Sequence, residues 1–261
     1  MTAVGCKGDL NIEDPNNPTT EDFWKSSSDA GMGVNAIYST FHRVGMTRWI
    51  YFMTIIRSDI GESKSPNHTI VNMCDQFNIV NYNDTHNQSM WQGLYIGINR
   101  ANQVLDNVPS IDMDATLKSQ YLGEAHFLRG YFYYELAMLY GNVPIVLHTS
   151  KPTDYPATKP QDSVYAQAEA DLTAATTELP ESYDASMLGR ATKGAAYAML
   201  GKAYMQQHKY QQAVDALQWV VDGPGKSIYK LVANYRDNFL ESTENNSESI
   251  FEIQNASNAI N

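Results

Sequence analysis

Cysteine is scarce in this chain of 261 residues, which has only Cys6 and Cys74. Two cysteines cannot build the framework of several disulfides that stabilises small secreted domains. We therefore expect a hydrophobic core to hold the fold, and a chain of this length can bury one as one domain or two. Cys74 is predicted to be a small, buried or half-buried side chain. A single bridge between the two cysteines remains the alternative.

Basic residues and long apolar runs are also in short supply. Lysine and arginine total 18 against 29 aspartates and glutamates, which gives a formal net charge of -11 and a pI of about 4.9. An acidic surface repels phosphate backbones, so nucleic acid is disfavoured as a partner, while neutral glycans and proteins stay open. No run of about 18 apolar residues occurs, so the sequence contains no candidate membrane-spanning helix.

The common catalytic and cofactor motifs are missing as well. There is no glycine-rich phosphate loop, no HExxH and no GxSxG. The six histidines are scattered without the spacing of zinc ligands, so we expect neither a metal nor a cofactor. A glycosidase needs two carboxylates across one sugar, but among 29 acidic residues some pair falls close by chance. Their number therefore does not indicate an enzyme.

The sequence is rich in segments with the pattern of amphipathic, aromatic-rich helices. Hydrophobic residues make up 43% of it and tyrosines number 17. Residues 121–146 (YLGEAHFLRGYFYYELAMLYGNVPIV) carry apolar side chains in steps of three or four, which puts them on one stripe of a helix. Gly141 and Asn142 supply a stop, and Pro144 prevents continuation. The stripe consists of Leu122, Ala125, Leu128, Phe132, Leu136 and Leu139.

Similar patterns predict further helices on both sides of this one. Ser89 and Asp162 are the expected N-caps of two of them, and Pro109 and Pro180 the expected stops. The expected spans are 21–44, 90–108, 163–179, 190–208 and 210–222.

The remaining residues are predicted to be irregular, with one exception. Residues 45–88 and 141–160 have the composition of long connections. Residues 249–254 (SIFEIQ) alternate like a strand.

A repeat is the strongest architectural signal. Tyr197-x2-Leu200-Gly201-x2-Tyr204 is followed nine positions later by Ala213-x3-Leu217, as in a tetratricopeptide unit. Tyr133-x2-Leu136-Ala137-x2-Tyr140 repeats the first half, and Ala168-x3-Leu172 follows after 28 positions. Solenoid repeats tolerate such an insertion at the hairpin turn. We expect tetratricopeptide-like hairpins at about 121–179 and 190–222, with a generic helical bundle as the alternative.

Several segments, in this order, resemble the SusD/RagB family of surface glycan-binding lipoproteins from Bacteroidetes. Each is weak alone, but the ordered set covers nearly the whole chain. After Cys6 and its polar tail, the matching segments are Trp91-x2-Leu94-Tyr95, Asn99-Arg100-Ala101-Asn102, Gly123-Glu124-Ala125-x-Phe127-Leu128-Arg129, Tyr140-Gly141-Asn142-Val143-Pro144, Asp162-Ser163-Val164-Tyr165, Gly189-Arg190-Ala191-Thr192 and Asn246-x-Glu248-Ser249-Ile250-Phe251.

The resemblance implies an all-α, SusD-like scaffold of tetratricopeptide-like hairpins with long irregular loops. It also implies capture of glycans for a SusC-like TonB-dependent transporter of the outer membrane. We expect residues 1–20 to be a polar tether and residues 21–261 to be a helical domain. Family members usually have about twice this length, so we expect this domain to lack the C-terminal half. Glu124, Arg129 and Arg190 are expected to be structural, with a specific partner for Arg190, and Trp91 to belong to the core.

Cys6 is the expected point of attachment to the membrane. Small residues precede it, a polar tail follows it, and the resemblance implies a lipidated cysteine. Alanine rather than the usual leucine stands three positions before it, and the charged and apolar regions of a signal peptide are missing. We expect a lipid-anchored protein on the cell surface, in contact with the outer membrane through its lipid only.

The expected ligand site lies in residues 45–88, where aromatic and short polar side chains mix. Sugars present flat C–H faces and rings of hydroxyls, so a site for them needs an exposed aromatic beside polar groups. The candidates are Trp49, Phe77 and Tyr82 with Arg57, Asp59 and Asn83. Alternatively, Trp49 and Phe77 pack under the loop, and Arg57 and Asp59 form a surface pair.

Three functions remain open from the sequence. The first is non-catalytic glycan capture for a transporter, which the resemblance favours. The second is a tetratricopeptide-type scaffold that binds a protein or peptide in its groove. The third is an enzyme that cleaves glycans.

Overall fold

The computed structural model describes residues 23–64, 69–78 and 84–255, and helices dominate this part of the chain. The only regular strands in the described ranges are β1 (Val143–Pro144) and β2 (Thr158–Lys159), which pair antiparallel. The expected all-α class with long irregular loops is confirmed. The α-helices are α2 (Ser27–Tyr38), α3 (Ile50–Ile55), α4 (Thr69–Asp75), α5 (Thr85–Asn107), α6 (Ala115–Tyr140), α7 (Gln161–Glu178), α8 (Lys193–Gln206) and α9 (Tyr210–Val221).

Shorter helical turns connect these helices. A π-helical turn, η2 (Gly45–Trp49), leads into α3. The 3₁₀ turns are η1 (Ser39–His42), η3 (Val108–Ser110), η4 (Ala185–Met187), η5 (Pro224–Ser227), η6 (Tyr235–Phe239) and η7 (Glu241–Thr243). No helix in the described ranges is long and apolar enough to cross a membrane.

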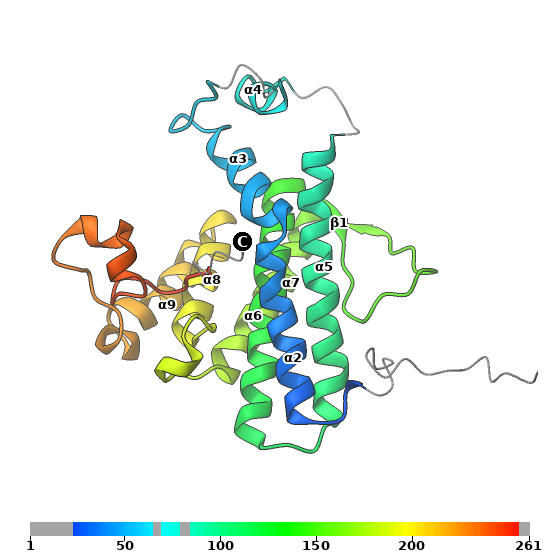
Figure 1. Cartoon of the computed structure of the whole chain (residues 1–261), viewed down its shortest axis with the longest axis vertical. Coiled ribbons are helices and arrows are strands. Elements are labelled where there is room, and N and C mark those ends of the chain that lie inside the picture. The colour runs from blue at the N-terminus through cyan, green and yellow to red at the C-terminus, as the bar shows by residue number, and fades with distance from the viewer. Residues whose placement is uncertain (1–22, 65–68, 79–83, 256–261) are drawn as a thin grey trace, which may run out of the picture.

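The long helices stack in sequence order. α2 packs on α5 and α6, α5 on α6, α6 on α7, α7 on α8, and α8 on α9. In Figure 1, α2, α5 and α6 stand close together along the long axis of the molecule, and α8 and α9 lie to one side of them. Packing of each hairpin mainly on its neighbours is what a tetratricopeptide-like array produces.

Two glycines mark where the helices of each hairpin come closest. A Cβ added at Gly201 of α8 would lie 2.5 Å from Cγ of Leu217 on α9, so only glycine fits there. Both residues belong to the tetratricopeptide-like pattern of the sequence. In the α6–α7 hairpin the residue under Leu172 is Gly130, whose added Cβ would lie 2.9 Å from Cγ of Leu172. The close approach in this hairpin therefore falls at Gly130, seven residues before Ala137 of the repeat pattern and about two helical turns away from it.

The predicted first helix over 21–44 is also wrong in length. α2 ends at Tyr38, the η1 turn follows, and Arg43 is extended (φ -73°, ψ 143°). Gly45 begins the next helical turn, η2, and a Cβ added to it would lie 2.2 Å from the carbonyl oxygen of Ser89. The chain breaks here so that its backbone can cross α5 at a glycine. The hydrophobic pattern runs on through the break and so gives no sign of it.

Helix starts differ from the predicted caps by several residues. The Asp84 carboxylate, not Ser89, caps α5 and accepts hydrogen bonds from the backbone N–H groups of His86 (3.2 Å) and Asn87 (2.9 Å). Asp114 caps α6, which begins before the expected residue 121. Pro160 occupies the cap position of α7, and Asp162 lies in its first turn. The stop at Gly141 is confirmed, with φ at +70°.

The core runs through the middle of the stack and is rich in aromatics. α6 contributes side chains on most of its circumference because α2, α5 and α7 all pack on it. Trp91 is half-buried against the core, with its ring 5.0 Å from that of Tyr140. The largest fully buried core side chains are Tyr133, Tyr134, Phe127, Phe132, Ile37, Leu94, Ile98, Leu128, Leu136 and Leu172.

A buried ion pair joins α6 to α7. Arg129 Nε donates to Asp171 Oδ2 at 2.8 Å and its Nη2 donates to Oδ1 at 2.7 Å, so the pair is bidentate. Arg129 Nη1 also donates to Asn102 Oδ1 of α5 at 2.9 Å. Asn102 Nδ2 in turn donates to the carbonyls of Val146 and His148. The network fixes α5, α6, α7 and the connection after α6 to one another, which confirms the structural role expected for Arg129.

A second buried pair joins α6 to the loop before α8. The Glu124 side chain has no exposed surface, and Arg190 Nη1 donates to its two carboxylate oxygens at 3.0 and 2.9 Å. Arg190 Nη2 donates to Asn35 Oδ1 of α2 at 2.8 Å. Arg190 therefore has the specific partner that the sequence predicted.

The predicted strand over 249–254 is wrong. These residues run without a regular element and have no partner strand in the part of the chain that the structure describes. Side chains hold the segment instead, because Phe251 packs against Phe127 and Phe41 at ring-centroid distances of 5.1 and 6.5 Å. Alternating hydrophobicity here reflects one face resting on helices rather than pairing in a sheet.

Candidate functional site

The predicted site region forms one end of the molecule. In Figure 1, α4 lies above the start of α5 at the top of the molecule, and α3 lies beside that end of α5. A cleft of about 310 Å³ opens where α3, α4, α5 and α6 meet. We call it the Arg57–Phe77 cleft. Its lining consists of Met53, Arg57, Phe77, Asn87, Met90, Leu139 and Tyr140.

Phe77 stands at the rim of the cleft in an unusual backbone conformation. Its φ is +53°, in the left-handed region that bulky residues rarely adopt, and the residue is 66% exposed. Its N–H donates to the Cys74 carbonyl and the N–H of Asn78 to that of Met73, at 3.1 and 2.8 Å. This is the Schellman arrangement that ends a helix, at a position usually held by glycine. Strained residues of this kind gather at functional sites, so the phenylalanine calls for a functional reason.

Arg57 lies against Phe77. Its guanidinium carbon is 5.1 Å from the centroid of the Phe77 ring, within the range of a cation–π contact. Both residues are exposed. Together they present an apolar ring and five N–H donors on one surface.

The floor of the cleft is apolar and sulfur-rich. Met53, Cys74 and Met90 form a buried cluster, with the Cys74 Sγ 3.1 Å from the Met53 Sδ. Burial raises the pKa of the Cys74 thiol, which keeps the side chain neutral. The expectation of a small buried cysteine is confirmed, and Cys74 is free.

The opposite wall carries a polar pair that the sequence analysis did not select. The Tyr140 hydroxyl donates to Asn87, whose carbonyl oxygen lies at 3.1 Å and whose Oδ1 lies at 2.9 Å. Burial raises the pKa of Tyr140, so its hydroxyl stays a donor at neutral pH. From the sequence, Tyr140 belonged to the repeat and to a segment of the family resemblance but not to the predicted site, because its position opposite Phe77 depends on how α6 ends beside α4.

The structure brings together two of the six predicted site residues, Arg57 and Phe77. Trp49 does not line the cleft. Its half-buried ring packs against the Met53–Cys74–Met90 cluster and lies 4.0 Å from the His86 ring, edge to face. Asp59 is exposed in the turn after α3. Tyr82, Asn83 and the predicted lipidation residue Cys6 lie outside the described residues.

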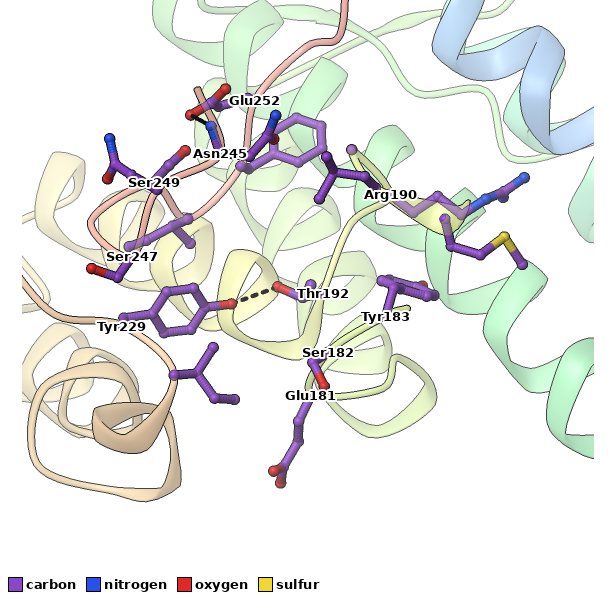
Figure 2. Close-up of a pocket in the computed structure, with 17 residues that line it drawn as sticks. Glu181, Ser182, Tyr183, Arg190, Thr192, Tyr229, Asn245, Ser247, Ser249 and Glu252 are labelled. Carbon is purple, nitrogen blue, oxygen red and sulfur yellow. Dashed lines mark hydrogen bonds between the residues drawn. The ribbon is translucent and has the colours of Figure 1, made fainter. Parts of the chain in front are cut away.

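A second hollow, of about 240 Å³, lies near the C-terminal end of the described chain, between residues 181–192 and 228–252. Figure 2 shows the polar side chains around it and two of the hydrogen bonds between its walls. Thr192 Oγ1 and the Tyr229 hydroxyl are 2.8 Å apart, and the backbone N–H of Asn245 donates to Glu252 Oε1 at 3.0 Å. The Arg190 guanidinium points out of this hollow to Glu124. These contacts join the segments on either side of the hollow to one another.

No group of metal-ligating side chains occurs among the described residues. The Arg57–Phe77 cleft offers ring, guanidinium, hydroxyl and amide, which suit binding by stacking and hydrogen bonds.

Comparison with known proteins identifies the family. A sequence model of SusD-like proteins, described as starch-binding and associating with the outer membrane, matches residues 36–205. A SusD-like protein of Formosa agariphila is 27% identical over 241 residues, which cover 90% of this chain and 46% of that protein. The starch-binding protein SusD of Bacteroides thetaiotaomicron is 25% identical over 186 residues, covering 68% and 32%.

Solved structures agree with this match. A laminarin-binding SusD-like protein superposes with a TM-score of 0.77 at 29% identity, over 87% of this chain and 51% of that one. The chain spans about half the length of the curated relatives it matches. Because the family model covers well over half of the chain and the fold agrees, this chain belongs to the SusD-like family.

Proposed function

We propose that this protein captures glycans at the cell surface without cleaving them, and delivers them to a SusC-like TonB-dependent transporter in the outer membrane. Membership of a family described as starch-binding supports glycan as the ligand class. The observation that carries the site is the exposed, strained Phe77 beside the Arg57 guanidinium.

The chemistry of the Arg57–Phe77 cleft fits a sugar ring. The flat C–H face of a pyranose packs on an aromatic ring, and its hydroxyls accept hydrogen bonds from a guanidinium and exchange them with an amide such as Asn87. None of the described residues that line the cleft is a carboxylate. A glycosidase needs two carboxylates flanking the scissile bond, and assays for released sugars test that alternative.

Two kinds of glucan are the first ligands to test. One structural neighbour is described as laminarin-binding, and one relative as starch-binding. Oligosaccharides of laminarin and of starch therefore form the core of a panel, to be measured with the purified protein by isothermal titration calorimetry.

Phe77→Gly separates binding from folding. Glycine fits the left-handed position without strain, so we expect the free energy of unfolding to be unchanged or higher. Loss of the ring should raise the Kd for the best glucan about tenfold, which corresponds to about 1.4 kcal/mol. The matched control is Phe239→Gly, because Phe239 is 70% exposed on η6 and lines neither this cleft nor the hollow of Figure 2.

Equal Kd values for Phe77→Gly and the parent would place the glycan site elsewhere. If the folded parent protein binds no glycan from the panel, the proposed function is wrong. In that case binding of an extended peptide would favour the tetratricopeptide-type scaffold, and release of shortened sugars would favour an enzyme.

Lipidation at Cys6 and partnership with the transporter belong to the same proposal. In the full-length precursor, Cys6→Ser should move the protein from the membrane fraction to the soluble fraction, because two or more acyl chains on one cysteine give stable anchoring. Fractionation followed by immunoblotting measures this, in cells with and without the neighbouring transporter gene. A Cys6→Ser protein that stays with the membrane when the transporter is absent would contradict the anchor.

A further inference from the structure

A larger hollow lies on the other side of α3 from the Arg57–Phe77 cleft. Its volume is about 540 Å³, and η2, α3, α6 and α8 contribute to its lining. On α3, Met53 lines the cleft, whereas Tyr51 and Thr54 line this hollow. On α6, Met138 lines the hollow and the next residue, Leu139, lines the cleft. The two hollows therefore flank one short helix. We call this one the Glu135 hollow.

A buried carboxylate faces the Glu135 hollow. Glu135 is 6% exposed, yet it is one of the lining residues. Burial raises its pKa, while the Lys202 ammonium and a hydrogen bond from Tyr131 act in the opposite direction. A carboxylate has about four acceptor positions, and one buried away from water needs donors for them. Tyr131 supplies one, which leaves capacity toward the hollow.

A donor lines the same hollow as this acceptor. Lys202 of α8 is exposed and lines the same space, with its Nζ 5.4 Å from the centroid of the Tyr134 ring. Both side chains are fully described, and no ion pair joins Lys202 to Glu135. The ammonium nevertheless acts against the rise that burial causes in the pKa of Glu135, and an acceptor and a donor both line the one hollow.

An exposed aromatic ring completes the set. Tyr51 of α3 is 58% exposed and lies on the rim of the Glu135 hollow. An exposed tyrosine offers one apolar face and one hydroxyl. Acceptor, donor and ring on different walls are the groups that a neutral sugar ring uses, because its hydroxyls both donate and accept while its C–H face is apolar.

We propose that the Glu135 hollow is a second sugar-binding subsite, separate from the Arg57–Phe77 cleft. Glu135 accepts from one ring hydroxyl, Lys202 donates to another, and the Tyr51 ring covers the C–H face. A cationic ligand fits less well, because the Lys202 ammonium would repel it. This subsite rests on glycan binding as the proposed function and adds a second place on the protein where glycan is held.

The test uses variants that leave the fold intact. Glu135→Gln keeps the shape of the side chain and removes its charge, and Tyr51→Ala truncates an exposed ring. Tyr155→Ala is the matched control, since Tyr155 is 91% exposed in the connection between β1 and β2 and lines neither hollow. Laminarin and starch oligosaccharides serve as probes in calorimetric titrations, with thermal unfolding of each variant as the check on folding.

We expect Glu135→Gln and Tyr51→Ala each to raise the Kd for the best oligosaccharide by about fivefold to tenfold, with Tyr155→Ala unchanged. Combined with Phe77→Gly, the effects should multiply, because separate contacts contribute additively to the free energy. If the parent binds glucan and Phe77→Gly weakens it while both Tyr51→Ala and Glu135→Gln bind normally, the second subsite is wrong and the proposed function stands. If Glu135→Gln fails to fold, Tyr51→Ala alone decides, since its ring is exposed. If the parent binds no glucan, the proposed function itself fails.

Discussion

Replacing Arg129 by alanine is expected to lower the free energy of unfolding by about 3–5 kcal/mol, the cost of removing one partner from a buried ion pair. The side chains of Arg129 and Asp171 are 8% and 4% exposed, and two hydrogen bonds join them. Without the guanidinium, the Asp171 carboxylate stays buried between α6 and α7 with no countercharge. Urea unfolding followed by circular dichroism measures the change.

Two further variants control this result. Arg236→Ala removes an exposed arginine from η6 and should change the stability by no more than about 0.5 kcal/mol. The double variant Arg129→Met with Asp171→Leu replaces the pair by apolar side chains of similar size and should recover most of the loss, because a well-packed apolar pair can equal a buried ion pair. A loss below about 1 kcal/mol for Arg129→Ala would contradict the role assigned to this pair.

Arg190→Ala is expected to destabilise the protein by an amount that depends on pH. Burial already raises the pKa of Glu124, and the Arg190 guanidinium opposes that shift. Removing the guanidinium should raise the pKa of Glu124 further. Below its ordinary value of 4.5 the carboxyl is protonated in both folded and unfolded chains, so its burial costs little charge energy. As the pH rises the unfolded chain ionises first, and the stability of the variant falls until the pH passes the folded pKa.

The expected loss relative to the parent is therefore small just below pH 4.5 and grows to about 3–5 kcal/mol near neutrality. Urea unfolding of both proteins across this pH range measures it. Adding Glu124→Gln to Arg190→Ala should abolish the pH dependence, because a neutral amide replaces the titrating group. A loss that is the same at every pH would mean that Glu124 keeps its charge in the variant, and the explanation through its burial would be wrong.

The sequence predicted the helical class and the hairpins because these depend on short-range patterns, whereas the structural arginines were expected from the family resemblance. A helix repeats about every 3.6 residues, so an apolar stripe such as that of residues 121–139 is visible in one chain. A glycine where two helices cross is visible in the sequence as the small residue of the repeat, and Gly201 was identified from this spacing. Helix ends were predicted less well, because a cap is whichever side chain reaches the free N–H groups, as Asp84 does for α5.

The candidate site was predicted as a region but only partly as a set of residues. Arg57 and Phe77 are 20 positions apart, and the composition of residues 45–88 was enough to select both. Trp49 met the same criterion, yet its ring turns toward the buried sulfur cluster. Tyr140 was not selected because it ends a helix far along the chain that meets α3 only after folding, and Asn87 was not selected although it lies in the same region, because its role depends on Tyr140.

The sequence by itself thus determined the fold class, the order of the helices, the resemblance to the SusD-like family and the partner requirement of Arg190. The tertiary structure alone decided the register of the α6–α7 hairpin, the lining of the Arg57–Phe77 cleft and the position of Glu135 beside an open hollow. The physical reason is the distance along the chain over which each effect acts. Hydrophobic periodicity acts within a few residues and is therefore visible in the sequence. Which side chain faces a cleft depends on packing between elements far apart in the chain, where a turn ended one residue earlier moves every following side chain to another face.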